Sequence, residues 1–186
     1  MADIHFDFSK NATRKQIFGT LVSIIEDETR RAMVGRIVGD VSVRMEEHFH
    51  NVGEVYAGID RSIASEYAKN HAKAIYHVLA EAEAQVHGCE IEETHFHEVG
   101  KGMTVREILG LCTAIEIIGP EKITATPVQV GSGTVECSHG VLDIPAPATK
   151  AILDKYEIPV QEEKLEGELC TPTSAAFIAH YVDIFE

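Results

Sequence analysis

The sequence predicts an α/β or α+β domain in which helices pack on a mixed sheet. Short β-branched runs alternate with longer segments whose apolar residues recur at helical spacing, most regularly in the second half of the 186 residues. Apolar residues make up 45%, an ordinary value for a globular core. No run rich in Pro, Ser or Gly divides the chain, so we expect a single domain over residues 1–186, with a weak seam near 88–94.

The first half is expected to contain two strands and three helical segments. The helix spacing of Ile17, Leu21 and Ile24 is clear, whereas Ile37 and Val41 are β-branched residues typical of a strand. Asn70 is expected to cap the last helix and Gly88 to end it. The predicted elements are strands over 4–8 and 35–46, and helices over 12–28, 55–68 and 70–88, which give a helical segment around residues 54–88.

The second half is expected to alternate helices and strands. Thr104 is the predicted cap of its first helix, and Thr171, followed by Pro172, the cap of its last. Gly119 and Pro120 end the first of these helices. The predicted elements are helices over 104–118, 145–156 and 171–185, and strands over 122–130, 134–137 and 158–163.

Charge and cysteine content exclude several classes of protein. Lys and Arg number 16 against 30 Asp and Glu, a net charge of −14, and no cations cluster, so we expect binding to neither nucleic acid nor membrane. No apolar run approaches the ~20 residues of a membrane span, and no targeting signal is visible. Four scattered cysteines without a Cys-x-x-Cys motif indicate reduced thiols, each a small core residue, in a cytoplasmic protein.

Two His-Phe-His segments are the strongest candidates for a metal site. In an extended segment residues i and i+2 face the same side, so His48 and His50 would point together, as would His95 and His97. Neutral imidazole is a good ligand for nickel, zinc and copper, and Glu98 could be a further ligand or orient a ring.

A structural interpretation of the same segments stays open. Phe49 and Phe96 could be the buried residues, with the flanking histidines exposed to water. His139, two residues after Cys137, could complete a soft ligand pair or could simply lie at the end of a strand. His87, in the last turn of its helix, is explained by the helix dipole.

Two further segments are candidates for phosphate or nucleotide binding. Gly131, Ser132 and Gly133 form a tight turn that could expose backbone N–H groups, and Thr171 and Thr173 open a helix, where free N–H groups attract anions. An ordinary turn and an ordinary helix cap explain both without a ligand. No Walker, Gly-x-Gly-x-x-Gly or Gly-x-Ser-x-Gly motif is present.

Three blocks in order resemble a known family. "LAEAEAQVHG" followed by "ETHFHEVG", then "VQVGSGTVECSHGVLDIPAPAT", then "GELCTPTSAAFIA" resemble the nickel-insertion proteins of lactate racemase maturation, over roughly residue 46 to the C-terminus. The resemblance implies insertion of nickel into a pyridinium bis-thiocarboxylate mononucleotide, with CTP as co-substrate, a lyase-class reaction.

The sequence also departs from that family. "KNATRKQ" replaces a Ser-Gly-Asp-Met segment, Lys101 to Thr104 replace an Asp-Ser pair, and a nucleotide-using C-terminal half does not follow. Two hypotheses result. One is a nickel-handling domain that binds Ni²⁺ and a mononucleotide but has no CTP site of its own, so that it needs a separate nucleotide-binding subunit. The other is a non-catalytic relative that acts in binding or assembly. A homo-oligomer is compatible with both.

Overall fold

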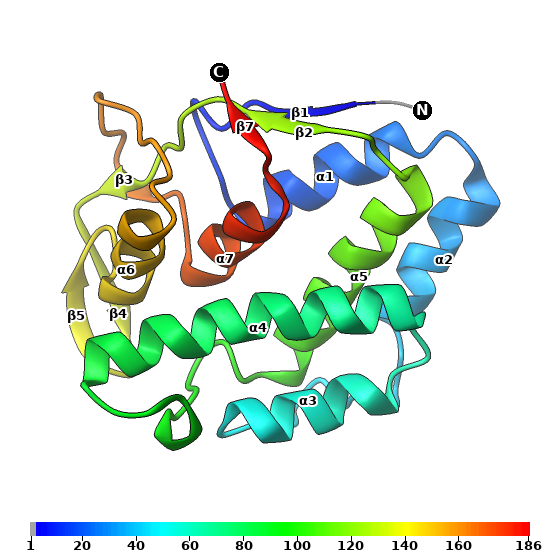
Figure 1. Cartoon of the computed structure of the whole chain (residues 1–186), viewed down its shortest axis with the longest axis horizontal. Helices are drawn as coiled ribbons and strands as arrows, with labels where there is room; N and C mark the ends of the chain where they lie inside the picture. Colours follow the sequence, from blue (N-terminus) through cyan, green and yellow to red (C-terminus); the bar gives the residue numbers. More distant parts are fainter. Residues whose placement is uncertain (1–2) are drawn as a thin grey trace.

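A small parallel sheet with helices packed beneath it organises the computed structural model, which describes residues 3–186 (Figure 1). Strand β2 (Ile123–Ala125) lies in the middle, with β1 (Ile4–Phe6) on one side and β7 (Ile184–Phe185) on the other, and both pair with it in parallel. The long connections between these strands carry the helices, as parallel pairing requires. The predicted α/β class is confirmed.

Seven α-helices and one short 3-10 helix make up about half of residues 3–186. In Figure 1, α4 runs the length of the molecule on the side away from the sheet, with α3 beside it. The helices are α1 (Arg14–Ile24), α2 (Glu28–Val38), α3 (Val52–Arg61), α4 (Glu66–His87), η1 (Ile91–Glu93), α5 (Gly102–Ile118), α6 (Pro147–Lys155) and α7 (Pro172–Tyr181).

Two small antiparallel ladders lie beside α6. Strand β3 (Gly131–Ser132) pairs with β6 (Gly167–Glu168), and β4 (Thr134–Cys137) pairs with β5 (Gly140–Asp143) as a hairpin. Side chains along the hairpin are exposed or half-buried, and its ladder pairs only its own two strands. Residues 137 to 139 therefore sit at the tip of a projecting element.

Several predicted elements and boundaries are confirmed. The first strand, the helix after it, the 134–137 strand and the helices before and after it all form. Gly88 and Gly119 end α4 and α5 in the left-handed conformation, with φ of 65° and 58°. Thr171 caps α7 through its side-chain oxygen, and Pro172 occupies the first helical position.

The strand predicted over 35–46 is wrong. Its first residues complete α2, and the remainder forms turns. Asp27 caps that helix by accepting a hydrogen bond from the Arg30 amide at 2.7 Å. Val34 and Ile37 are both buried, and their spacing of three residues is helical. The β-branched residues thus misled the prediction, because tertiary packing overrides β propensity.

Two predicted caps are also wrong. The helix of residues 70–88 begins earlier, at Glu66, with the Ser65 hydroxyl accepting from the Ala68 amide at 3.1 Å instead of Asn70 capping it. Helix α5 begins at Gly102 rather than after Thr104, and Lys101 at its N-cap makes no side-chain capping bond.

Two predicted strands are shorter in the structure than the sequence predicts. Strand β2 covers only Ile123–Ala125 of the predicted 122–130, and 158–163 forms a single bridge between Val160 and Val128. All four cysteines are free thiols, as expected. Cys112 and Cys170 are buried, but Cys89 and Cys137 are partly exposed, so the prediction that each cysteine is a core residue is wrong for these two.

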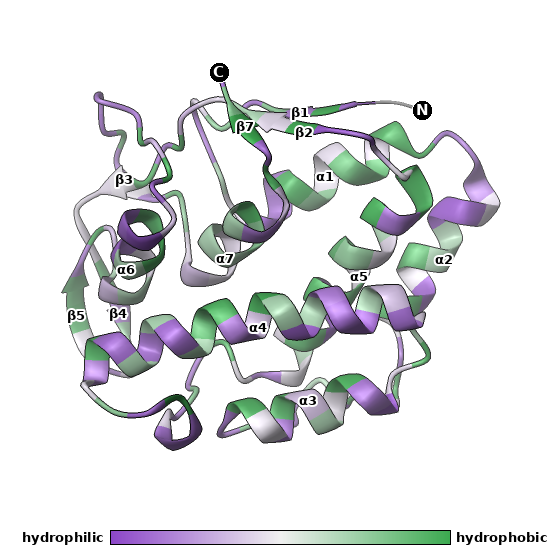
Figure 2. Cartoon of the chain, in the orientation of Figure 1, coloured by the Kyte–Doolittle hydropathy of each residue, from purple (hydrophilic) through white to green (hydrophobic). Residues whose placement is uncertain are grey.

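One hydrophobic cluster runs from the sheet to α4. Phe6 in β1 is fully buried, stacks on Phe8 at 5.2 Å between ring centroids, and meets Phe177 of α7 edge-on at 6.1 Å. Figure 2 shows α4 with hydrophobic and hydrophilic residues alternating along its length. Its buried stripe includes Ile75, Val78 and Leu79, as the spacing in the sequence predicts.

The two His-Phe-His segments lie side by side. The Phe49 amide donates to the Gly100 carbonyl at 2.8 Å, and the Phe96 amide donates to the His50 carbonyl at 2.7 Å. Phe49 and Phe96 are 3% and 1% exposed, whereas the four flanking histidines are exposed. The structural interpretation of these segments is therefore confirmed for the phenylalanines, and the histidine side chains are exposed to solvent.

Tyr76 anchors the second His-Phe-His loop to α4. Its buried hydroxyl donates to the Val99 carbonyl at 2.8 Å, and its ring lies 5.9 Å from that of Phe96. Tyr76→Phe would leave the carbonyl without its partner, and we expect the free energy of unfolding to fall by about 1–3 kcal/mol. The matched control is Tyr156→Phe, which removes a longer hydroxyl contact of 3.3 Å to Glu81 at the surface.

Urea unfolding of both variants checks this prediction. Tyr156→Phe should change stability by less than about 0.5 kcal/mol. Equal effects of the two substitutions would contradict the anchoring role of Tyr76.

Candidate functional site

A cavity of about 720 Å³ opens between the C-terminal part of α4, the second His-Phe-His loop, the β4–β5 hairpin and the start of α7. We call it the His97 cavity. Its polar lining contains imidazoles, carboxylates, a thiol, hydroxyls and two cations: Arg14, Glu83, His87, His97, Glu98, Lys101, Thr104, Glu136, Cys137, Ser138, His139, Glu168, Thr171 and Thr173.

His97 lies at the centre of a group of imidazoles. The His139 ring meets it edge-on, with centroids 4.6 Å apart, and the His87 ring lies 5.3 Å from that of His139. His48 Nε2 donates to the His97 carbonyl oxygen at 2.8 Å, and the His48 and His50 rings are 4.6 Å apart. Three segments far apart in sequence therefore bring five imidazoles into one region.

The electrostatics of this group favour neutral imidazoles. Partial loss of hydration, followed by repulsion from the imidazoles of His139 and His48, lowers the pKa of His97. Burial raises the pKa of Glu83, and the adjacent His87, with Nε2 3.5 Å from Glu83 Oε2, opposes that shift. Neutral imidazole is the form that binds metal.

Not every predicted ligand lines the cavity. His97, Glu98 and His139 do, whereas His48, His50 and His95 are not among its lining residues. Glu98 is paired with Lys101 at 2.6 Å, with both side chains more than half exposed. The Glu98 carboxylate must break its ion pair with Lys101 before it can bind a metal ion.

The donor atoms are of the right kind for nickel but are not assembled around one point. Within residues 3–186, no three His, Cys, Asp or Glu side chains are arranged to hold a metal ion. The rings of His97 and His139 meet edge-on. Side-chain rotation at the exposed imidazoles is needed before two of them can share an ion.

The start of α7 contributes hydroxyls to the same cavity. Thr171 Oγ1 accepts from the Ser174 amide at 3.4 Å and lies 3.1 Å from the hydroxyl oxygens of both Thr173 and Ser174. The N-terminus of a helix carries a partial positive charge that favours an anion. Arg14 also lines the cavity, paired with Glu107 at 3.1 Å. These groups are suited to a phosphate.

The Gly-Ser-Gly turn is used in building the fold. Gly131 has φ of 87°, and a Cβ there would lie 1.8 Å from the Gly167 carbonyl oxygen, so only glycine fits. The Gly131 amide donates to Gln129 Oε1 at 3.0 Å, and the Ser132 hydroxyl donates to the Leu165 carbonyl at 2.9 Å. Gly131, Ser132 and Gly133 are not among the residues that line the His97 cavity.

Sequence reasoning missed several polar residues of the cavity, including His87, Glu83 and Arg14. The helix dipole alone explains His87 in the sequence, yet the His87 ring lies 5.3 Å from that of His139. Glu83 lies one helical turn before it, and this i, i+4 pair of potential ligands was a usable signal. Arg14 lies in the segment that departs from the resembled family, and its place in the cavity depends on the fold of α1.

Comparison with known proteins shows to which family the chain belongs. The sequence profile described as "Nickel insertion protein" matches residues 2–186. The chain belongs to this family. Its match to the profile spans both the imidazole segments and the start of α7. No solved structure matches the chain.

Curated relatives carry the same description. A pyridinium-3,5-bisthiocarboxylic acid mononucleotide nickel insertion protein of Staphylococcus saprophyticus is 40% identical over 131 residues, 70% of this chain and 33% of the relative. Putative nickel insertion proteins of Geobacter metallireducens and Dictyoglomus thermophilum are 42% and 40% identical, covering 74% and 75% of this chain and 35% and 36% of theirs. The chain thus matches about a third of the length of these relatives.

The helices of residues 3–186 include none with the length and apolar character needed to span a membrane.

The capping role of Thr171 can be separated from any ligand. Thr171→Ala removes the oxygen that caps α7, and we expect a loss of about 1 kcal/mol in the free energy of unfolding without any ligand. Thr171→Ser keeps the oxygen and is the matched control. Thermal or urea unfolding of the two variants checks this, and an unchanged stability of Thr171→Ala would show that the cap contributes nothing.

Proposed function

We propose that this chain binds nickel as a substrate and a phosphate-bearing mononucleotide in the His97 cavity, and so serves as the metal-handling part of a nickel insertion protein. The observation that supports this most is that one cavity combines the imidazoles of His87, His97 and His139 with the hydroxyls at the start of α7. The names of the relatives pair the same two chemistries, nickel and a mononucleotide.

The chemistry of the donor groups assigns the metal ion and the phosphate to different parts of the cavity. Imidazole suits nickel, and the exposed rings keep the ion exchangeable. The helix N-terminus and Arg14 would hold the phosphate. A ligand with thiocarboxylate groups, as the relatives' names specify, would then offer sulfur donors to an ion held by His97 and His139. The imidazoles bind the ion and release it, and they stay chemically unchanged.

A second candidate function is a binding or assembly protein without turnover. Two observations favour it. Glu98 is paired with Lys101 rather than free. The donors within residues 3–186 are also not assembled as a three-ligand site. For the first function we propose a separate cytoplasmic subunit that uses the nucleotide. The two functions then differ in one respect, because nickel insertion should require both polypeptides.

Nickel binding is the first test. We expect saturable binding of Ni²⁺ in isothermal titration, weakening below about pH 6 as imidazoles protonate. His97→Ala combined with His139→Ala should remove the nickel bound in this cavity, since both rings line it. His95→Ala should have a smaller effect than His97→Ala, because His95 is not a lining residue.

The control for this titration is His77→Ala, an exposed histidine of α4 that pairs with Glu81 at 3.5 Å. Nickel binding that is unchanged in the His97 and His139 double variant would contradict the proposal that the His97 cavity binds nickel. Binding of a mononucleotide should raise the free energy of unfolding by about 2.7 kcal/mol at a hundredfold excess over its dissociation constant. Such a rise would support phosphate binding at the start of α7.

The second test concerns CTP. We expect the chain alone to release no pyrophosphate or phosphate from CTP with magnesium or manganese. Nucleotide hydrolysis needs cations or a carboxylate-held metal to neutralise developing charge. The chain has a net charge of −14 and no Walker motif. Robust turnover that copurifies with this chain would overturn the expectation, whereas turnover only after mixing with a second polypeptide would support the partner.

A further inference from the structure

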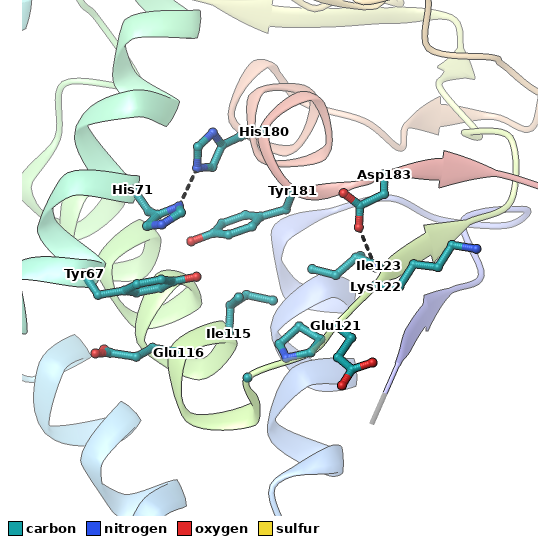
Figure 3. A pocket seen from close by; sticks show the side chains of 12 residues that line it. Tyr67, His71, Ile115, Glu116, Glu121, Lys122, Ile123, His180, Tyr181 and Asp183 are labelled. Atoms are coloured by element: carbon teal, nitrogen blue, oxygen red, sulfur yellow. Dashed lines mark hydrogen bonds between the residues drawn. The ribbon is translucent and has the colours of Figure 1, made fainter. Parts of the chain in front are cut away.

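A second cavity, of about 540 Å³, lies on the opposite half of α4 and shares no lining residue with the His97 cavity. We call it the His71 pocket; Figure 3 shows it from close by. Its walls are α4, the last turn of α5, the loop that follows α5, and the end of α7. His71 precedes His87 by sixteen residues, which places it about 24 Å away along the helix.

Two histidines from different helices face each other in this pocket. His71 Nδ1 of α4 lies 2.7 Å from His180 Nε2 of α7. Tyr67, one turn before His71, lies 4.1 Å from its ring, and the Tyr181 ring stacks on it at 5.3 Å with an angle of 9°. Figure 3 shows His71 above Tyr67 and beside Tyr181. Aromatic contacts therefore hold the His71 ring in the orientation that points Nδ1 at His180.

The charges around the pair favour a cation. Three carboxylates line the pocket, from Glu116, Glu121 and Asp183, against the single ammonium of Lys122. Glu116 accepts a hydrogen bond from the Ser65 hydroxyl at 2.5 Å. The pocket also takes in the last turn of α5, where a helix end has partial negative charge.

Burial of the two rings disfavours their protonated forms. Burial lowers the pKa of His180 to about 4, with a further contribution from His71, and burial also lowers the pKa of His71. Without a bound ion, one ring must donate its N–H and the other accept it. Each neutral ring can instead carry its proton on its other nitrogen, which leaves both facing nitrogens as lone pairs of the kind that divalent transition metals bind.

We propose that His71 and His180 form a second metal site, which takes a first-row divalent transition ion such as Ni²⁺ between Nδ1 of one ring and Nε2 of the other. Bond lengths of about 2.0–2.1 Å require the two nitrogens to be about 2.9 Å apart for a right-angled coordination. The observed 2.7 Å is the length of a direct hydrogen bond, so both rings must rotate for their lone pairs to converge on an ion. The site is independent of the His97 cavity, so each of the two proposals can be wrong without the other.

The ligand count makes this ion exchangeable. Among residues 3–186 no third His, Cys, Asp or Glu completes the pair as a coordinating group. The remaining positions therefore go to water, with Glu116 supplying charge nearby. A closed structural site would need four protein ligands. We therefore expect a labile ion that links α4 to α7.

Bound nickel per chain, measured by equilibrium dialysis and metal analysis, tests the proposal. His71→Asn combined with His180→Asn should lose one equivalent relative to the wild type. His77→Asn, an exposed histidine of the same helix, is the matched control and should lose none. His97→Ala with His139→Ala should leave this equivalent in place, so failure of the His97 cavity and failure of this site give different results.

A measurement on the wild-type protein covers the case in which the double variant does not fold. Paramagnetic Ni²⁺ should broaden the backbone amide signals of residues 67–71 and 180–183 in NMR spectra. A simple helix-to-helix hydrogen bond predicts a lower melting temperature in the double variant with an unchanged nickel count. That outcome, or an absence of broadening around these residues, would overturn the proposal.

Discussion

Backbone pairing of the two His-Phe-His segments determines where the imidazoles lie. It requires close backbone approach at two glycines: a Cβ at Gly100 would lie 2.1 Å from the Phe49 carbonyl oxygen, and one at Gly102 would lie 1.8 Å from that of Arg44. The pairing buries Phe49 and Phe96 and turns the neighbouring histidines outward. Because α5 starts at Gly102, the same contact also positions the helix that packs on α4.

Helix α4 connects the two histidine sites. Its 22 residues carry Glu83 and His87 at one end and Tyr67 and His71 at the other, while its middle packs on α5, α6 and α7. Burial of one face fixes the rotation of the helix, and this rotation decides which side chains reach each cavity. A substitution that shifts α4 by one turn would thus disturb both sites together.

Periodicity is sufficient to predict the fold class and most helices, and motif spacing singles out His97, His139 and the start of α7, which line one cavity. The errors have local causes. β-branched residues suggested a strand where Val34 and Ile37 are spaced for a helix. The contact of His87 with His139, and that between His71 and His180, join residues over 50 and over 100 positions apart. No local pattern encodes such contacts, because they arise from the packing of whole helices.

The incomplete assembly of donors in the His97 cavity is compatible with nickel as cargo. A closed tetrahedral site binds its ion as a structural element, and that ion would not leave readily. A carrier needs fewer protein ligands, so that the acceptor can supply the rest. Imidazoles on exposed segments meet this need, since they rotate at little cost and bind nickel only when neutral. The lowered pKa of His97 keeps that ring neutral at acidities where an ordinary histidine would already be protonated. Hydration and neighbouring imidazoles around His97 therefore affect how readily this ring can bind a metal ion.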